Sequence, residues 1–214
     1  MKTVAIIGSG AVGKTLAQGF LTYGHPVVVA SRSADKRAEL EAAIPGITTA
    51  DFAEAAKQGD IIVLAVKGHA AEEAVTLCGP QHLAGKTVID ATNPIDDSTP
   101  PTNGVLHYFT NFGHSLMETL QLLAPEAHFV KAFNSVGSHR MVNPVFAAGK
   151  PSMFICGNHE TAKAEVRGIL DQFGWETEDM GGIEAARAIE PLAMLWCIPG
   201  FRENRWGHAF KLLQ

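Results

Sequence analysis

The sequence predicts an α/β fold built on a doubly wound, mostly parallel sheet, with a short C-terminal helical segment. Two observations predict it. Short β-branched runs alternate with helical patterns along the first 130 residues, and the runs are apolar throughout rather than at alternate positions. Strands that are buried on both faces have this pattern, because crossover helices cover each side of a parallel sheet. The β-α-β order therefore favours a doubly wound arrangement.

The predicted elements of the first part of the chain follow one another regularly. The expected strands are residues 3–7, 27–30, 61–66, 87–90 and 128–130. The expected helices are residues 11–23, 34–43, 51–58, 69–78 and 114–123. Ser33 and Asp51 stand where N-cap residues are preferred, and Gly24, Gly46 and Gly59 follow helical stretches that they would end.

A second set of elements follows the Gly- and Pro-containing stretch 134–151. It comprises a strand at 152–156, a helix at 160–173, a strand at 175–178 and a helical run at 183–197. We expect residues 1–150 to form the core that carries the binding site described below and residues 151–214 to complete the sheet and the cleft. The last helical run is apolar on most faces and must be covered. This helical run could close over the cleft, pack on the sheet or contact a second copy of the protein. We favour the last of these, a homodimer.

Composition excludes several classes of protein. The 214 residues are 46% hydrophobic and 18% charged, with a net charge of -5, as in compact globular proteins. The excess of acidic over basic residues indicates no basic surface of the kind that binds nucleic acid. No apolar stretch approaches the roughly 20 residues that cross a bilayer, and the first one is too short for a secretory signal. The three cysteines, Cys78, Cys156 and Cys197, fit reduced buried thiols and a cytoplasmic location.

A glycine-rich turn directly follows the first strand and opens the first helix. Its residues are Gly8, Ser9, Gly10, Ala11, Val12 and Gly13. The first glycine permits a tight turn, the second lets a pyrophosphate approach the backbone, and the third lets helix and strand pack closely. The helix N-terminus adds free N–H donors and a partial positive charge. In this setting the motif predicts dinucleotide binding and a Rossmann fold.

The residues after the second strand indicate which dinucleotide binds. NAD-binding proteins carry a carboxylate there for the ribose 2'-hydroxyl, about 20 residues past the glycines. This chain instead has Ser31 and Arg32, with Lys36 one helical turn further on. Hydroxyl groups and two cations suit a 2'-phosphate. We therefore predict NADP(H), although a solvated basic turn would also have this sequence.

Other strand ends should point into the same crevice, because ligands of open α/β sheets bind outside the carboxyl ends of the strands. The candidate cofactor contacts there are Ala65, Val66, Lys67, His69, Asn93, Pro94, Ala132, Phe133 and Asn134. Among them, Asn93 and the backbone of Ala132 could orient the nicotinamide.

No residue is predicted to be catalytic. His69 fits either a carbonyl-polarising role or a helix cap, and His139 with Arg140 fits either an anionic substrate or an exposed loop. The tyrosines lack a lysine at helical spacing, which disfavours short-chain carbonyl reductases. The histidines and cysteines lack metal-ligand spacing, so no metal is expected.

Taken together, the motifs resemble those of the NADPH-dependent reductases of the deazaflavin coenzyme F-420 and the related cytoplasmic domain of certain metalloreductases. The resemblance spans nearly the whole chain, and its most specific part is the Lys-Ala-Phe-Asn stretch at 131–134. It implies that Ser31, Arg32 and Lys36 hold the 2'-phosphate and that the nicotinamide lies near the turn at 132–134. The chain departs from the family at Lys67-Gly68, where members often carry Trp-Glu.

These observations predict an NADP-dependent oxidoreductase that transfers hydride between NADPH and a deazaflavin or flavin. Hydride transfer mainly needs donor and acceptor held face to face in a dry site, so the protein need not supply an acid. Two alternatives are a non-catalytic NADP(H)-binding redox sensor and a reductase of a small carbonyl or imine.

Overall fold

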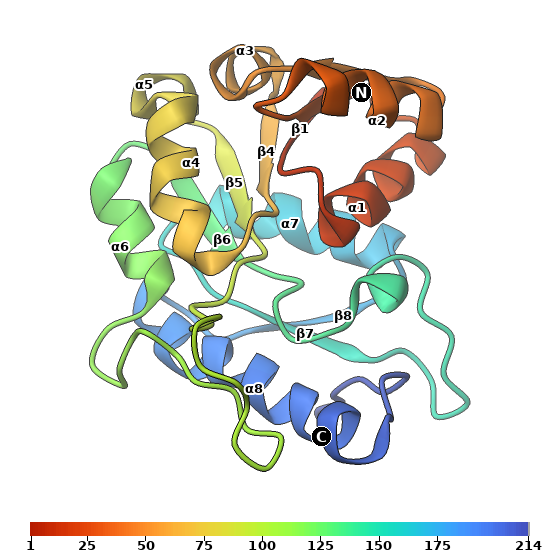
Figure 1. The fold of residues 1–214 in the computed structure, drawn as a ribbon, viewed down its shortest axis with the longest axis vertical. Helices are drawn as coiled ribbons and strands as arrows, with labels where there is room; N and C mark the ends of the chain where they lie inside the picture. Colours follow the sequence, from red (N-terminus) through yellow and green to blue (C-terminus); the bar gives the residue numbers. More distant parts are fainter. Residues whose placement is uncertain (214) are drawn as a thin grey trace.

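The main sheet has six parallel strands in the order β3-β2-β1-β4-β5-β6, which confirms the doubly wound prediction (Figure 1). The structure is a computed structural model that describes residues 1–213. The strands are β1 (Val4–Ile7), β2 (Val27–Ala30), β3 (Ile47–Ala50), β4 (Ile61–Leu64), β5 (Thr87–Asp90) and β6 (His128–Lys131). The direction in which successive strands are added reverses between β1 and β4. In sheets of this kind, ligands bind in a crevice outside the carboxyl ends of the strands at such a point.

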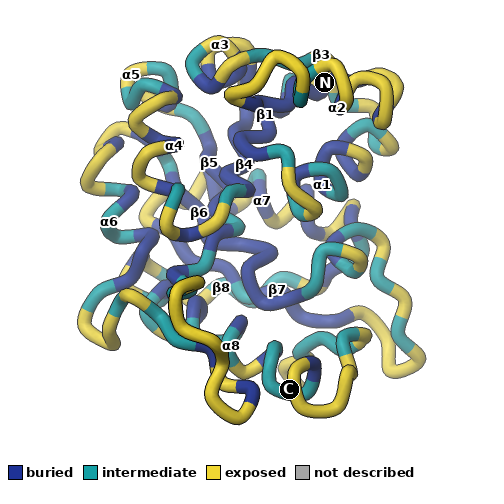
Figure 2. The backbone as a smooth tube through the Cα atoms, in the orientation of Figure 1, coloured by how far each residue is buried: buried dark blue, intermediate teal, exposed yellow. Residues whose placement is uncertain are grey.

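Helices cover both faces of this sheet. They are α1 (Ala11–Thr22), α2 (Ala34–Ala43), α3 (Phe52–Gln58), α4 (Ala71–Cys78), α5 (Pro80–Leu83), α6 (Leu116–Leu123) and α7 (Glu160–Gln172). Alternate residues of β1 face two separate cores, one shared with α1 and α7 and the other with α3, α4 and α6. Figure 2 shows the inner strands β1, β4, β5 and β6 as the buried centre of the domain. The continuous apolar runs are thereby explained.

Local signals placed most helix ends correctly. The side chains of Ser33 and Asp51 accept hydrogen bonds from the third backbone N–H of α2 and α3. Gly24 and Gly46 adopt φ of 82° and 98°, the left-handed region that favours glycine after a helix. Gly59 has an extended backbone instead. A larger residue does not fit at this position, because a Cβ there would lie 2.5 Å from the Cβ of Ala5.

The sequence did not predict β3. This strand lies at the edge of the sheet, and only Ile47 of its four residues is buried. Thr48 and Thr49 interrupt the apolar pattern, so the run is not continuous. Strand β4 is shorter than expected and ends at Leu64, which places Ala65 and Val66 in the turn at the crevice.

The C-terminal strands do not continue the main sheet, and that prediction is wrong. Strands β7 (Ser152–Ile155) and β8 (Glu176–Asp179) pair in parallel as a separate two-stranded sheet. An antiparallel bridge, in which the N–H of Lys131 donates to the carbonyl of Cys156 at 3.0 Å, joins it to the end of β6. An apolar run indicates burial but does not indicate which strand is its partner. The domain boundary at residue 150 stays a prediction.

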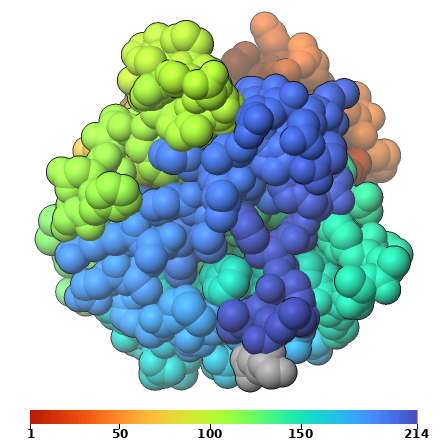
Figure 3. Space-filling view, turned by 90° about the horizontal axis from the view of Figure 1, so that it is seen from below, coloured from red at the N-terminus to blue at the C-terminus, as the bar shows by residue number. Residues whose placement is uncertain are grey.

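The last helix is longer than predicted. A short 3-10 turn η3 (Ile183–Ala185) leads into α8 (Ala186–Glu203), which contains Pro191 and Pro199 and ends at Asn204 with φ of 52°. Figure 3 shows α8 and the C-terminal residues spread across the lower face. Leu195 and Phe201 are exposed on this helix. The homodimer stays a prediction, and a sedimentation profile with monomer alone at micromolar concentration would contradict it.

The three cysteines are unpaired. Cys78 and Cys156 are buried and Cys197 is half-buried, and burial raises the pKa of the first two to about 12. The predicted burial is thus confirmed for Cys78 and Cys156 but not for Cys197, and raised pKa values make the two buried thiols poor nucleophiles. Within residues 1–213, no helix is both long and apolar enough to cross a membrane.

Candidate functional site

Two of the three glycines in the glycine-rich turn lie too close to other backbone atoms to carry a side chain, and the third faces open space. Gly8 has φ of 126°, and a Cβ there would lie 2.4 Å from the carbonyl oxygen of Ala65. A Cβ on Gly13 would lie 2.1 Å from the carbonyl oxygen of Gly8. Gly10, in contrast, has φ of -78° and no atom within 4 Å of its Cβ position. The space over Gly10 is therefore free for a ligand.

This opening lies at the N-terminus of α1. Gly10 is the N-cap residue and has no side chain to accept hydrogen bonds from the first turn. The first N–H groups of a helix have no partner within the helix and carry a partial positive charge. Ser9 is half-buried and Ala11 is exposed beside them, whereas Val12 is partly buried against the core. A pyrophosphate fits this turn.

The cationic corner adjoins the glycine turn. A pocket of about 450 Å³ brings Gly8, Ser9 and Val66 together with Ser31, Arg32 and Lys36. The structure thus assembles residues from three separate strand ends, as the sequence predicted. The pocket has room for a phosphorylated ribose and offers it two cationic side chains, while the carboxylates of Asp35 and Glu39 also line it.

Carboxylates already pair with both cations of the corner. Glu73 of α4 lies 3.3 Å from Arg32, and Glu39 lies 3.2 Å from Lys36. All four side chains are exposed, so each pair is worth little in stability. The sequence did not predict Glu73, because α4 reaches this corner only in the folded chain.

Replacing Glu73 with Gln is expected to tighten NADPH binding by about two- to fivefold, the range of an exposed ion pair. The carboxylate of Glu73 competes with a 2'-phosphate for Arg32, and its removal ends the competition. Titration calorimetry measures the change, with Glu72→Gln on the same helix as the matched control. Weaker NADPH binding by Glu73→Gln would contradict competition and show that Glu73 orients Arg32.

A second pocket lies at the carboxyl ends of β4 and β5. It has a volume of about 140 Å³ and is lined by Val66, Lys67, Gly68, Ala91, Thr92, Asn93, Ile95 and Asp97. A Cβ on Gly68 would lie 2.0 Å from the carbonyl oxygen of Asn93, so glycine lets the two loops touch. Pro94 is buried directly behind this contact.

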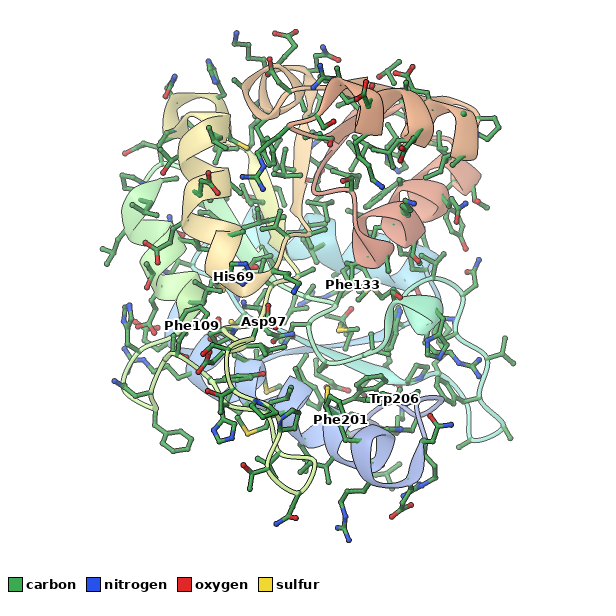
Figure 4. All side chains as sticks on the ribbon, in the orientation of Figure 1. His69, Asp97, Phe109, Phe133, Phe201 and Trp206 are labelled. Carbon is green, nitrogen blue, oxygen red and sulfur yellow. The ribbon has the colours of Figure 1, made fainter. Side chains whose placement is uncertain are left out.

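Asp97 connects these two loops at the mouth of the crevice. Its carboxylate accepts a hydrogen bond from Lys67 Nζ at 2.9 Å and lies 3.3 Å from His69 Nδ1. Figure 4 shows Asp97 close to His69, near the start of α4. Asp97 lies in the loop after β5, which contains Pro100 and Pro101, and no sequence signal placed it beside His69.

The turn at 132–134 has an unusual backbone. Phe133 has φ of 63°, the left-handed region that non-glycine residues rarely adopt, and it is fully buried. Its ring packs against Phe173 in the core. Its N–H donates to the sulfur of Met153 at 3.2 Å. Ala132 is likewise fully buried at the end of β6.

Two amides join this turn to the second pocket. The side chain of Asn93 donates to the carbonyl of Asn134 at 2.8 Å, and that of Asn134 donates to Asn93 Oδ1 at 3.2 Å. Asn134 Oδ1 is buried without a partner in the protein. An amide or hydroxyl donor of a ligand would satisfy such an oxygen. The site residues therefore fit a nicotinamide nucleotide that runs from the cationic corner to this turn.

The structure places His139 and Arg140 apart from both pockets. They lie in the 3-10 turn η2 (Ser138–Arg140), where Arg140 stacks over the ring of Phe146 at 5.2 Å. Among residues 1–213, no group of three His, Cys, Asp or Glu side chains could hold a metal ion.

The doubly wound sheet, the open glycine turn and the cationic corner define a Rossmann oxidoreductase of the NADP-binding class. The family model for coenzyme F420-dependent NADP oxidoreductases matches residues 3–94. A candidate F420-dependent NADP reductase from Arthrobacter sp. FB24 has a solved structure that covers all of both chains at 30% identity, with a TM-score of 0.92. The chain belongs to the family of coenzyme F420-dependent NADP oxidoreductases.

Two curated relatives extend the comparison. Rat metalloreductase STEAP3 is 31% identical over 202 residues, which are 92% of this chain and 38% of that protein. The F420-dependent NADP reductase of Methanothermobacter thermautotrophicus is 29% identical over 212 residues, with 91% of this chain and 87% of that protein covered. The chain thus spans about 38% of the metalloreductase. The predicted family and the NADP cofactor are confirmed.

Proposed function

We propose that the protein transfers hydride between NADPH and a planar redox acceptor, a deazaflavin or flavin. The observation that carries the proposal is that the pocket at the cationic corner, which includes Gly8 and Ser9 of the glycine turn, and the second pocket, which includes Asn93, share Val66 as a lining residue. An extended dinucleotide of the NADP type matches the chemistry of these two pockets. The name of the Methanothermobacter relative supports the deazaflavin as acceptor.

In this proposal the chain positions and desolvates the reactants. Arg32 and Lys36 would hold the 2'-phosphate, the first turn of α1 would hold the pyrophosphate, and Asn93 and Asn134 would orient the carboxamide. The nicotinamide supplies the hydride when it is bound. The acceptor takes up both electrons with the hydride, and a proton from solvent balances its charge.

Incubation with NADPH and a panel of deazaflavin, flavin and quinone acceptors tests the proposal. We expect NADPH oxidation with a deazaflavin or flavin well above the rate without protein. No oxidation with any acceptor would contradict the enzymatic function. Tight NADPH binding without turnover would instead support the redox sensor. A cytoplasmic location stays a prediction.

A second candidate function is the reduction of a small carbonyl or imine. The pairing of His69 with Asp97 favours it, because the pair places a proton-carrying ring at the mouth of the second pocket. If His69 donates a proton to the substrate, His69→Ala should abolish turnover of a carbonyl or imine while NADPH affinity persists. Full turnover of these substrates by His69→Ala would exclude this role.

A further inference from the structure

A buried cluster of three charged side chains lies directly beneath the crevice. Lys131 Nζ lies 2.6 Å from Asp90 Oδ2 and 2.9 Å from Glu190 Oε1. The lysine and Asp90 side chains are 0% exposed and that of Glu190 is 2% exposed. These residues come from β6, β5 and α8, so the cluster joins the main sheet to the C-terminal helix.

Two members of the cluster hold the turn that follows β5. Asp90 Oδ1 accepts hydrogen bonds from the N–H of Thr92 at 2.9 Å and from its hydroxyl at 2.7 Å. Lys131 Nζ donates to the carbonyl oxygen of Thr92 at 3.0 Å. The N–H, hydroxyl and carbonyl groups of Thr92 are thereby held in place. The next residue, Asn93, lines the second pocket.

Helix α8 holds the other side of the site through adjacent residues. The carbonyl of Ile189 accepts a hydrogen bond from the side chain of Asn134 at 2.9 Å. The carboxylate of Glu190 binds Lys131 and accepts hydrogen bonds from the N–H groups of Leu116 and Met117, at 3.1 and 3.0 Å. Adjacent residues of α8 therefore hold the turn at 132–134 and the start of α6 directly, and they hold the turn at 92–93 through Lys131.

The fold alone does not require these charges. Desolvation of buried ions is costly, and well-packed hydrophobic residues of similar volume are often equally stable in their place. Burial lowers the pKa of Lys131, but Asp90 and Glu190 raise it by more, so the lysine stays charged. The hydrogen bonds of Asp90 and Lys131 end on Thr92, which lines the second pocket, and this gives these charges a reason to be there.

We propose that Lys131, Asp90 and Glu190 are positioning residues that fix the turns at 92–93 and 132–134 for the nicotinamide half of NADPH. Helix α8 then determines how the ring is presented to the acceptor. The inference rests on the proposed function for its link to hydride transfer, but its effect on nucleotide binding is independent of turnover.

Glu190→Gln is the decisive variant, because Gln keeps one oxygen for the N–H groups of α6, in place of the two that Glu190 offers to Leu116 and Met117, and removes the charge that holds Lys131. The matched control is Lys163→Met. Lys163 is also a buried lysine, 5% exposed, and it pairs with the more exposed carboxylates of Glu160 and Asp179 on α7 and β8, away from both pockets. Lys131→Met is a second test variant, and Glu190→Gln keeps the test valid if Lys131→Met does not fold.

The readouts are the melting temperature, the dissociation constants of 2',5'-ADP and NADPH, and the rate of a single hydride transfer. Glu190→Gln should leave 2',5'-ADP binding unchanged and reduce NADPH affinity or the transfer rate about ten- to hundredfold, as expected for a misplaced reactant. Lys163→Met should lower the melting temperature and leave the ratio of the two dissociation constants as in the wild type.

Equal losses for both ligands in Glu190→Gln, or no loss in either ligand or in rate, would overturn the inference. An altered ratio of dissociation constants in a protein that turns over no acceptor would contradict the proposed function while the positioning role stands.

Discussion

Replacement of Arg32 with Ala is expected to weaken NADPH binding about tenfold or more and to leave NADH binding nearly unchanged. A hydrogen bond to a charged group contributes about 1.5–3 kcal/mol, and about 1.4 kcal/mol corresponds to a factor of ten in affinity. Arg32 is exposed, so the lower end of that range applies. Titration calorimetry with both nucleotides measures the change.

Arg167→Ala is the matched control for this experiment. Arg167 is another exposed arginine paired with a carboxylate, Asp179, but it lies on α7 away from the cationic corner. The control should bind both nucleotides like the wild type. If Arg32→Ala lost the same affinity for NADH as for NADPH, Arg32 would not contact the 2'-phosphate.

The glycine turn yields the second large effect. Gly10→Val is expected to fold with nearly the wild-type melting temperature and to lose detectable binding of NADPH. Its backbone angles suit any residue and its Cβ position is open, so the new side chain enters only the space reserved for the pyrophosphate. Differential scanning fluorimetry and calorimetry measure stability and binding separately.

Two further glycine variants serve as controls. Gly13→Val should destabilise the fold, because its Cβ would lie 2.1 Å from the carbonyl oxygen of Gly8. Gly168→Val is the neutral comparison for binding, since Gly168 of α7 also has open space at its Cβ position. NADPH binding by Gly10→Val at wild-type strength would show that the pyrophosphate does not approach this turn.

Local sequence signals predicted the parts of the site that local structure creates. The glycine turn and the corner at Ser31 and Arg32 follow strands that are apolar on both sides, so their positions could be read from the pattern of residues. The order of the parallel strands then brought the residues at their carboxyl ends together. In contrast, β3 was missed because Thr48 and Thr49 make an edge strand look like a loop.

The rest of the site depends on contacts between distant segments. Asp97 meets His69 and Lys67 through a proline-containing loop, and Glu190 meets Lys131 from the last helix. No local pattern distinguishes a buried glutamate in a helix from an exposed one until its partner is known. The pairing of β7 with β8 was missed for the same reason, because an apolar strand pattern does not specify which strand lies beside it.

The central claim is that the open glycine turn and the cationic corner together bind the phosphorylated dinucleotide. Titration of the wild-type protein with NADPH and with NADH in the same buffer tests it most directly. The account predicts that NADPH binds about tenfold tighter or more, as one charge-assisted phosphate contact implies. Equal or tighter binding of NADH, or heat from neither nucleotide, would contradict it.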